Sequence, residues 1–171
     1  ALDYQPGIVL QDFFGATDQP RLSIRGSGIQ SNPVNRGVVL LQDGLPLNEA
    51  DGSFVIGTLE PRNAALVSAR RGANTLTPSA TTLGGELDFQ SLTGADEPGV
   101  VRAEMGSFGR KALQGAFGLV GQQWDGRVSV SSDRFDGYRH HSASRRDALH
   151  ANVGFQSGGV ENRTYLSWTD L

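Results

Sequence analysis

The sequence predicts a small α+β domain, a mixed sheet with short helices, over residues 1–95, followed by antiparallel β strands over residues 96–171. Three observations lead to this fold class. Glycine supplies 23 of the 171 residues and is spread through the chain, which favours turn-rich β structure. The first region contains continuous apolar runs, and the second alternates apolar and polar residues. The stretch from Leu66 to Ser91 marks the change between the two regions.

Composition and charge narrow the classes of function. Residues 1–95 carry six Arg against nine Asp and Glu, and residues 96–171 carry nine Arg and Lys against nine acids. Neither region has the positive excess typical of nucleic-acid binding. The absence of cysteine excludes disulfides, Cys-based metal sites and Cys nucleophiles. No apolar run reaches the ~18 residues of a transmembrane helix, although alternating strands cross membranes without such a run.

The strongest local signal in the first region is a hairpin. Val38 to Leu41 is a continuous apolar run, which predicts a strand buried on both faces. Asp43-Gly44 follows and suits a type I′ turn, because both central residues of that turn need positive φ. Pro46 cannot donate to a ladder, so we expect the second arm to be short or to lie at a sheet edge.

Weaker signals lie on both sides of this hairpin. Residues 20–26 alternate apolar and polar side chains and predict a short, half-buried strand. The stretch Leu59 to Val67 predicts the start of a short helix with Pro61 in its first turn. The glycine pair Gly84-Gly85 predicts a tight turn that leads into a strand.

Residues 96–171 predict about five strands of about 9 to 11 residues, the length that spans an outer membrane when the strand is tilted. The alternation is clear from Val101 to Met105. The connections at Gly121–Gln123 and Gln156–Val160 are short, and the one at Phe135–Asp147 is long. Short turns on one side and longer loops on the other are typical of membrane barrels.

The chain resembles a known family through several motifs in a fixed order. The motifs are Pro6-Gly7-Ile8, PRLSIRGSG from Pro20, VVLLQDGLPL from Val38, RRGANTL from Arg70, TTLGGELDFQS from Thr81 and RAEMGSFGRKALQGAFG from Arg102. The first five are similar to the plug domain of TonB-dependent outer-membrane receptors, and the last resembles the first strands of their barrel. The resemblance implies a plug over residues 1–95 and the N-terminal part of a transmembrane β-barrel over residues 96–171.

The resemblance also implies a function. Receptors of this family import ferric siderophores or similar iron chelates through the cell outer membrane of Gram-negative bacteria, with the plug gating a barrel of about 22 strands. TonB would act through a segment outside this sequence, and outer-membrane lipid would surround the barrel. The resemblance implies no enzymatic activity and no cofactor, and the iron chelate would be the cargo. We expect the chain to be a fragment, since five strands leave two sheet edges open.

Two arginines match the positions that hold the plug in this family. Arg25 lies in the Ile-Arg-Gly motif and Arg71 in the later Arg-Gly motif, and the resemblance implies that each pairs with a barrel glutamate. A planar guanidinium suits this role because it can bond a carboxylate through two parallel hydrogen bonds. The alternative is two solvated surface arginines.

Substrate contacts in the family come from the outer tips of the plug and from the barrel wall. By position, the matching tip residues here are Gln30, Asn32, Asn48, Asp51 and Phe54. Ordinary turn formation is the alternative for each of them.

Other chemical motifs have simpler explanations. Gly26-Ser27-Gly28 lacks the further glycine and the helix of a phosphate-binding loop. His140-His141 would point to opposite sides of an extended chain, which makes a poor metal site. The carboxylates of Asp43, Glu86 and Asp88 have no nucleophile, base and orienting group beside them in the sequence, so no catalytic residues are predicted.

A second function remains open at this point. Glycine abundance and short strands also fit a β-rich surface binding or adhesion module that transports nothing.

Overall fold

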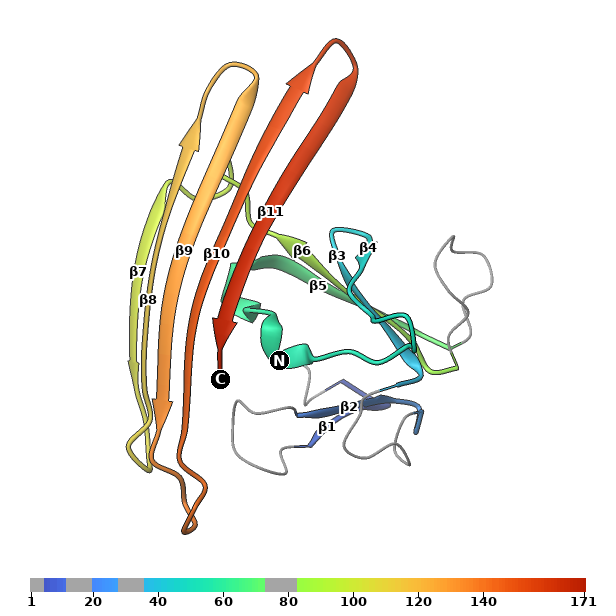
Figure 1. Cartoon of the computed structure of the whole chain (residues 1–171), viewed down its shortest axis with the longest axis vertical. Coiled ribbons are helices and arrows are strands. Elements are labelled where there is room, and N and C mark those ends of the chain that lie inside the picture. Colours follow the sequence, from blue (N-terminus) through green and yellow to red (C-terminus); the bar gives the residue numbers. More distant parts are fainter. Residues whose placement is uncertain (1–4, 12–19, 28–35, 73–82) are drawn as a thin grey trace. The chain divides into compact units, whose positions relative to one another are not determined.

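The computed structural model describes residues 5–11, 20–27, 36–72 and 83–171 (Figure 1). These residues form two compact units. Unit 1 consists of the described residues up to Ser91, and unit 2 consists of residues 92–171. No helix within the described ranges is long and apolar enough to cross a membrane.

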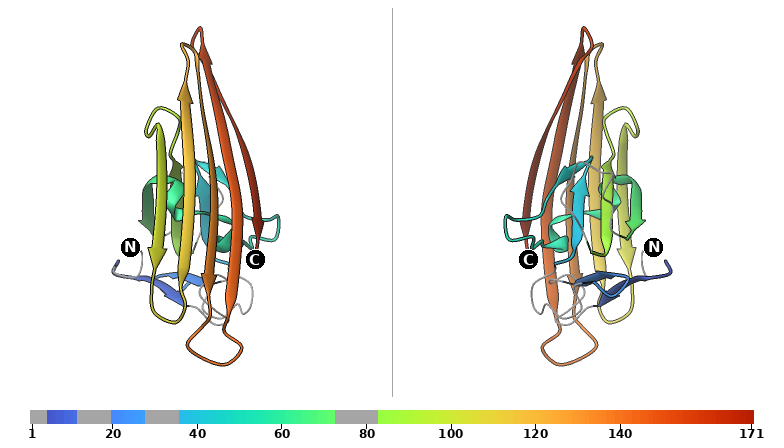
Figure 2. Two further views of the ribbon diagram at one scale, coloured as in Figure 1. Left: turned by 90° about the vertical axis from the view of Figure 1, so that its left-hand side faces the viewer. Right: turned by 90° about the vertical axis from the view of Figure 1, so that its right-hand side faces the viewer.

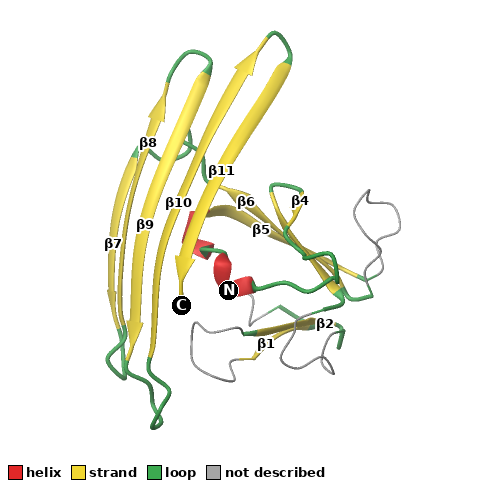
Figure 3. Cartoon of the chain, viewed as in Figure 1, coloured by secondary structure: helices red, strands yellow, loops and turns green. Residues whose placement is uncertain are grey.

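Unit 1 contains two sheets. In the smaller sheet, β1 (Ile8–Gln11) pairs antiparallel with β2 (Arg21–Ile24). The larger sheet has the order β4-β3-β6-β5 and consists of β3 (Val38–Gln42), β4 (Leu45–Pro46), β5 (Ala64–Arg71) and β6 (Gly85–Ser91). Because β3 and β6 are parallel while the other pairs are antiparallel, this sheet is mixed, as predicted (Figure 3).

The structure confirms the predicted hairpin between β3 and β4. Asp43 and Gly44 have φ angles of 51° and 78°, as a type I′ turn requires. The Asp43 carboxylate accepts hydrogen bonds from the backbone N–H of Ser91 at 2.7 Å and from its hydroxyl at 2.6 Å, which tie the turn to the end of β6. The two-residue strand β4 lies at the sheet edge. Pro46 has no backbone N–H to donate, and an edge strand tolerates this because it pairs on one side only.

One cluster of apolar side chains forms the core of unit 1. It joins the two sheets, because its buried members come from both: Ile8, Leu22, Ile24, Val38, Leu40, Phe54, Ile56, Leu59, Leu87 and Phe89. Leu40 and Leu87, which are neighbours in the parallel β3–β6 ladder, are 0% exposed. Burying a side chain of this size contributes about 1.5–3 kcal/mol. The core therefore accounts for the sequence preference for apolar residues on both faces of β3.

The prediction of short helices is wrong for the described part of unit 1. Only two three-residue 3-10 turns occur there, η2 (Ile56–Thr58) and η3 (Pro61–Asn63) (Figure 3). Pro61 does begin η3, and the carboxylate of Glu60 caps it by accepting from the backbone N–H of Arg62 at 3.1 Å. The chain then enters β5, because pairing with β6 outweighs the weak helix propensity of this segment.

Unit 2 is a single open antiparallel sheet of five strands in sequence order (Figure 2). The strands are β7 (Gly99–Met105), β8 (Lys111–Val120), β9 (Trp124–Phe135), β10 (Ser144–Ser157) and β11 (Val160–Asp170). Their number agrees with the prediction, but their lengths range from 7 to 14 residues. The long connection predicted at Phe135–Asp147 is shorter than expected. Strand β9 ends at Phe135 and β10 begins at Ser144, so only residues 136–143 connect them.

The strand register divides the side chains of unit 2 between two faces, because residues directly opposite each other share a face. One face, which we call the apolar face, carries Val101, Leu113, Phe117, Val128, Val130, Val153, Phe155, Leu166 and Trp168. Each of these side chains is at least 43% exposed. The opposite face, the polar face, carries Arg102, Gln114, Arg127, Ser129, Ser131, Asn152 and Arg163. A contiguous exposed apolar surface of this kind marks a membrane or protein contact.

Candidate functional site

The two predicted anchor residues lie close together in unit 1. Arg25 directly follows β2, and Arg71 is the last residue of β5. Both side chains flank Gly7, since a Cβ placed on that glycine would lie 3.8 Å from Cγ of Arg25 and 4.0 Å from Cδ of Arg71. A Cβ placed on Gly72 would lie 3.4 Å from Nη1 of Arg25. The fold thus brings the Pro6-Gly7, Ile-Arg-Gly and Arg-Gly motifs into one place.

Backbone hydrogen bonds fix the position of both arginines. The backbone N–H of Arg25 donates to the carbonyl oxygen of Gly7 at 2.8 Å. The Arg71 guanidinium donates from Nη1 to the carbonyl oxygen of Pro6 at 2.7 Å. Arg25 also has a φ of 52°, a left-handed conformation that costs a non-glycine residue about 1 kcal/mol or more. Such strained residues cluster at functional sites, which agrees with a role for Arg25 beyond packing.

Glycines allow the backbone to pack tightly behind these arginines. The backbone N–H of Gly72 donates to Gly84 at 2.7 Å, and that of Gly84 donates to Gly37 at 2.9 Å. A Cβ on Gly84 would lie 1.9 Å from the Ser27 hydroxyl, and one on Gly85 would lie 2.0 Å from the carbonyl oxygen of Arg70. The glycine pair seen in the sequence is therefore required by close backbone approach.

The two arginines differ electrostatically from their neighbours. Both are exposed, and within the part of the chain that the structure describes neither forms an ion pair. Other arginines of unit 1 do form ion pairs, among them Arg36–Asp51 at 2.6 Å, Arg62–Glu60 at 2.9 Å and Arg70–Glu86 at 2.8 Å. The stems of both arginines lie beside Gly7, and an exposed guanidinium can bind a carboxylate through paired hydrogen bonds. Their pairing with barrel glutamates stays a prediction.

Among the predicted substrate contacts, Asn48 holds the loop that follows β4. Its Oδ1 accepts from the backbone N–H of Leu40 at 2.8 Å, and its Nδ2 donates to the carbonyl oxygens of Val38 and Gly52, both at 3.0 Å. The amide thereby replaces a β-ladder partner for β3, whose edge would otherwise be unpaired there. This role uses one acceptor and both donors of the side chain.

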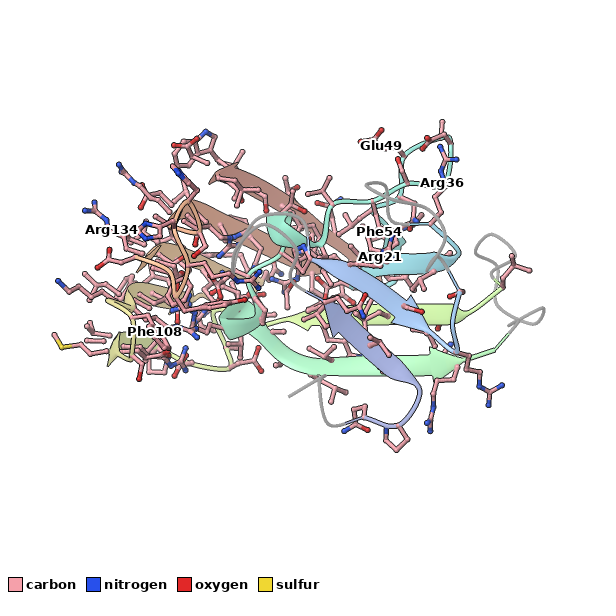
Figure 4. All side chains as sticks on the ribbon, turned by 90° about the horizontal axis from the view of Figure 1, so that it is seen from below. Arg21, Arg36, Glu49, Phe54, Phe108 and Arg134 are labelled. Carbon is pink, nitrogen blue, oxygen red and sulfur yellow. The ribbon has the colours of Figure 1, made fainter. Side chains whose placement is uncertain are left out.

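Asp51 lies in the same loop as Phe54, which is labelled in Figure 4. Asp51 accepts from the hydroxyl of Ser53 at 2.6 Å, from its backbone N–H at 2.9 Å, and from Arg36 at 2.6 Å. These hydrogen bonds, that of the Ser53 hydroxyl first, lower the pKa of Asp51 from 3.8 to about 2. Phe54 is 3% exposed and packs in the core. Gln30 and Asn32 lie outside the described residues, and substrate contact by any of the five stays a prediction.

Unit 2 contains a second organised region that sequence reasoning missed. Its first residues, 92–98, which we call the linker segment, are bonded to the polar face of the sheet. The bonds are Asn152 Nδ2 to the Leu92 carbonyl oxygen at 3.0 Å, the Gly94 N–H to Asp125 at 3.1 Å, and Arg127 to the Glu97 carbonyl and carboxylate oxygens at 3.0 Å each. The linker segment is therefore part of unit 2.

Asp125 and Arg163 stand at the centre of this region. Arg163 donates to both carboxylate oxygens of Asp125, at 2.6 and 2.9 Å, and to Oδ1 of Asn152 at 2.8 Å. Both charged side chains are 18% exposed, so water screens the pair only in part. Gly94 fits beside it because a Cβ there would lie 2.4 Å from two backbone carbonyl oxygens. The partners are 38 positions apart, and no local pattern in the sequence signals their contact.

The loops 106–110 and 136–143 of unit 2 also contact each other, and Phe108 of the first loop is labelled in Figure 4. The rings of Phe108 and Tyr138 meet edge to face at a centroid distance of 6.1 Å, and Arg139 lies over the Tyr138 ring at 4.7 Å. The neighbouring His140-His141 pair is exposed. Across the described ranges, no group of three His, Cys, Asp or Glu side chains could hold a metal ion.

No family model matches the sequence. Several solved structures are similar to the structure of this chain. The FrpB iron transporter from Neisseria meningitidis is 18% identical with a TM-score of 0.71. The match covers 98% of this chain and 28% of FrpB. The pyoverdine outer membrane receptor FpvA from Pseudomonas aeruginosa is 15% identical with a TM-score of 0.74. The match covers 98% of this chain and 24% of FpvA. The hemophore receptor HasR from Serratia marcescens, in complex with its hemophore HasA and heme, is 17% identical with a TM-score of 0.76. The match covers 98% of this chain and 28% of HasR.

These likenesses establish the fold, since they cover nearly all of this chain. Because the identities are low, they establish the fold alone. The chain spans about a quarter of the length of each of these three proteins. It therefore shares its fold with part of the TonB-dependent outer-membrane receptors, the family that its motifs resemble.

Proposed function

We propose that this chain is the plug and the first five barrel strands of a TonB-dependent receptor in the outer membrane of a Gram-negative bacterium. The plug is assigned to residues 1–95 and the barrel part to residues 96–171, close to the division between units 1 and 2. The receptor imports a ferric siderophore or a similar iron chelate and has no enzymatic activity. The apolar face of unit 2 is the observation that carries this proposal.

The apolar face has the dimensions of a membrane-spanning sheet. The ten residues of β8, at a rise of about 3.3 Å each, span about 30 Å, and an outer-membrane barrel needs an apolar band about 25 Å tall. Apolar side chains outside and polar side chains inside are also typical of such barrels. A β-rich adhesion module in water would have to cover this surface, so the observation favours the membrane protein over that alternative.

The arginine site supports a plug that is held and then released. Arg25 and Arg71 are two exposed arginines whose stems both lie beside Gly7, and their guanidinium groups would pair with glutamates on the inner wall of a barrel. Ion pairs in a partly wet interface hold a domain in place, yet they exchange for water more easily than an apolar core does. Cargo binding at the outer face, followed by force from TonB on a segment outside this sequence, would displace the plug.

The solved structures of the same fold support the proposed class of cargo. They are named as an iron transporter, a pyoverdine receptor and a hemophore receptor. For this chain we propose an iron chelate, with contacts from the plug tips at Gln30, Asn32, Asn48, Asp51 and Phe54 and from barrel loops. Because Phe54 is buried and Asn48 is bonded to β3, these two would act by shaping the loop that carries Asp51.

Uptake of a labelled iron chelate tests the transport proposal. Cells that express the full-length receptor are expected to accumulate ferric siderophore only when TonB is present and the inner membrane is energised. Equal uptake with and without TonB would refute the proposal.

Variants of the arginine site test its role in the same assay. The double variant R25A/R71A is expected to weaken TonB dependence and to let small solutes leak through the barrel, because the plug is held less firmly. R70A is the matched control, since Arg70 is an exposed arginine of unit 1 that pairs with Glu86 within the same unit. Equal leakage in the double variant and the control would contradict the anchoring role.

A further inference from the structure

The hydrogen bonds of the chain change partners across one peptide bond, between Ser91 and Leu92. The backbone N–H and the hydroxyl of Ser91 donate to the Asp43 carboxylate of unit 1, at 2.7 and 2.6 Å. The carbonyl oxygen of Leu92 accepts from Nδ2 of Asn152 in unit 2 at 3.0 Å. A residue bonded within unit 1 and a residue bonded within unit 2 are therefore adjacent in the chain.

The linker segment is held to the polar face of unit 2 by charged groups. The backbone N–H of Gly94 donates to the Asp125 carboxylate at 3.1 Å. Arg127 donates from one guanidinium nitrogen to the Glu97 carbonyl oxygen and from another to its carboxylate, both at 3.0 Å. The side chain of Arg127 is only 2% exposed, so lifting the linker segment off the face would leave a buried cation without its carboxylate. Bonds of this kind resist breakage more than exposed ion pairs do.

Glycines let the backbone of the linker segment lie directly against strands β8 and β9. A Cβ placed on Gly94 would lie 2.4 Å from the carbonyl oxygens of Gly126 and Leu119. A Cβ placed on Gly118 would lie 2.7 Å from the carbonyl oxygen of Glu97. Such distances leave no room for a side chain at either glycine, so the linker segment fits this one place on the sheet.

The linker segment also holds its own shape. The Asp96 carboxylate accepts from the backbone N–H and the hydroxyl of Thr93, both at 2.7 Å. The Thr93 hydroxyl oxygen in turn accepts from the backbone N–H of Ala95 at 3.3 Å. A segment that is already ordered loses less conformational entropy when it binds. The linker segment is therefore a preorganised part of unit 2 and not a slack tether.

We propose that the linker segment stays bound to the barrel wall while the plug is displaced, so that the moving part of the chain ends at Ser91. This inference rests on the proposed function, because it requires that force from TonB acts on unit 1. Asp125 and Arg127 act as positioning residues, since they hold the point to which the displaced plug stays attached.

The plug and the linker segment differ in how firmly each is held. The proposed anchors of the plug, Arg25 and Arg71, are exposed, and exposed ion pairs with carboxylates contribute little stability. The linker segment is held by the buried Arg127 and by Asp125, whose ion pair with Arg163 is 18% exposed. Force should therefore release the plug before the linker segment. In the competing account, the linker segment leaves the wall together with the plug.

Distances between spin labels in whole cells distinguish the two accounts. Ala95 of the linker segment and Gln123 of the β8–β9 turn line the same cavity of about 230 Å³, and Gln90 lies in β6. All three side chains are exposed, so labels can be attached without disturbing a core. In the full-length receptor, labels at A95C and Q123C report the wall distance, and labels at Q90C and Q123C report the plug distance.

Both distances are measured in energised cells during uptake of the ferric siderophore that the uptake assay identifies, and again in de-energised cells. Energised uptake should shift and broaden the plug distance and should leave the wall distance unchanged. A shift of both distances would overturn the inference, because the linker segment would then move with the plug. A shift of neither would also overturn it, because the moving part would then end before Gln90.

Two double variants test the positioning residues themselves. D125N/R127Q removes the charged holds on the linker segment and should let the wall distance lengthen in energised cells. E161Q/R145Q is the matched control, because it removes one carboxylate and one guanidinium at exposed positions of unit 2: Glu161 lines the same cavity, and Arg145 pairs with Asp147. Both variants should keep the resting wall distance in de-energised cells, which shows that each has folded.

Equal wall distances of the two double variants in energised cells would overturn the role of Asp125 and Arg127. Where a variant does not assemble, the two distances in the receptor without these substitutions still decide the inference. Uptake separates it from the proposed function. TonB-independent uptake by the unaltered receptor would overturn the proposed function, whereas TonB-dependent uptake together with a shifted wall distance would overturn this inference alone.

Discussion

Units 1 and 2 use apolar side chains in opposite ways. In unit 1 they are enclosed, and Leu40 and Leu87 are 0% exposed in the parallel β3–β6 pair. In unit 2 they point outward, and Val101 and Leu166 are 80% and 60% exposed. The sequence already separates the two cases, because the strand buried on both faces is a continuous apolar run whereas the two-faced strands alternate. Pattern, and not apolar content, determines which surroundings each unit needs.

The difference also changes what stabilises each unit. Unit 1 gains its stability in water from the enclosed core. The apolar face of unit 2 gains nothing from water, so in detergent or lipid the unit depends on its ladder hydrogen bonds and on the polar-face network around Asp125 and Arg163. Substitutions of matched size in the two units should therefore have unequal effects.

The largest difference is expected between two leucine truncations. L87A removes a fully buried side chain from unit 1 and should lower the free energy of unfolding by about 2–5 kcal/mol. L166A removes the same atoms from the apolar face of unit 2, where detergent replaces the lost contacts, and should cost less than about 1 kcal/mol. Denaturant unfolding in detergent, followed by hydrogen exchange in each unit, measures both. Equal losses would mean that the apolar face packs against protein.

Glycine substitutions sharpen the comparison at the level of the backbone. G85A places a Cβ 2.0 Å from the carbonyl oxygen of Arg70 at a φ of 139°, so β5 and β6 must separate, at a cost of about 3 kcal/mol. The control G158A lies in the β10–β11 turn, where nothing is within 4 Å and only its φ of 58° is unfavourable. That change should cost about 1 kcal/mol. A larger loss in G158A than in G85A would refute the close-approach account.

How much of this could be read from the sequence depends on how local the cause is. The Asp43-Gly44 hairpin was predictable because turn chemistry acts within a few residues, and the strands of unit 2 were predictable because alternation repeats along each strand. Strand β5 was mistaken for a helix because its conformation depends on pairing with β6, about 20 residues later. Motif order predicts that Arg25 and Arg71 are anchors, which stays a prediction, and only the fold shows that both side chains flank Gly7.

The polar-face network tests whether unit 2 has an equivalent of a core. D125N keeps the shape of the side chain but leaves the charge of Arg163 largely buried and weakly paired, which should cost about 2 kcal/mol. Amide hydrogen exchange should also speed up in the linker segment, because Gly94 donates to Asp125. R145Q, which loses an exposed pair with Asp147, is the control and should change stability by less than about 1 kcal/mol. Unchanged exchange of the linker segment in D125N would contradict this role.

The smallest effect concerns the pH dependence of unit 1. The pKa of Asp51 is lowered from 3.8 to about 2, so its carboxylate stabilises the folded state fully above about pH 4, and this contribution is lost as the pH falls through 2. D51N should remove that part of the acid sensitivity. S53A should remove more of it than R36Q, because the Ser53 hydroxyl is the strongest cause of the shift. Denaturant midpoints between pH 5 and about pH 2 measure the order, and a larger effect of R36Q would mean that charge, not hydrogen bonding, holds this loop.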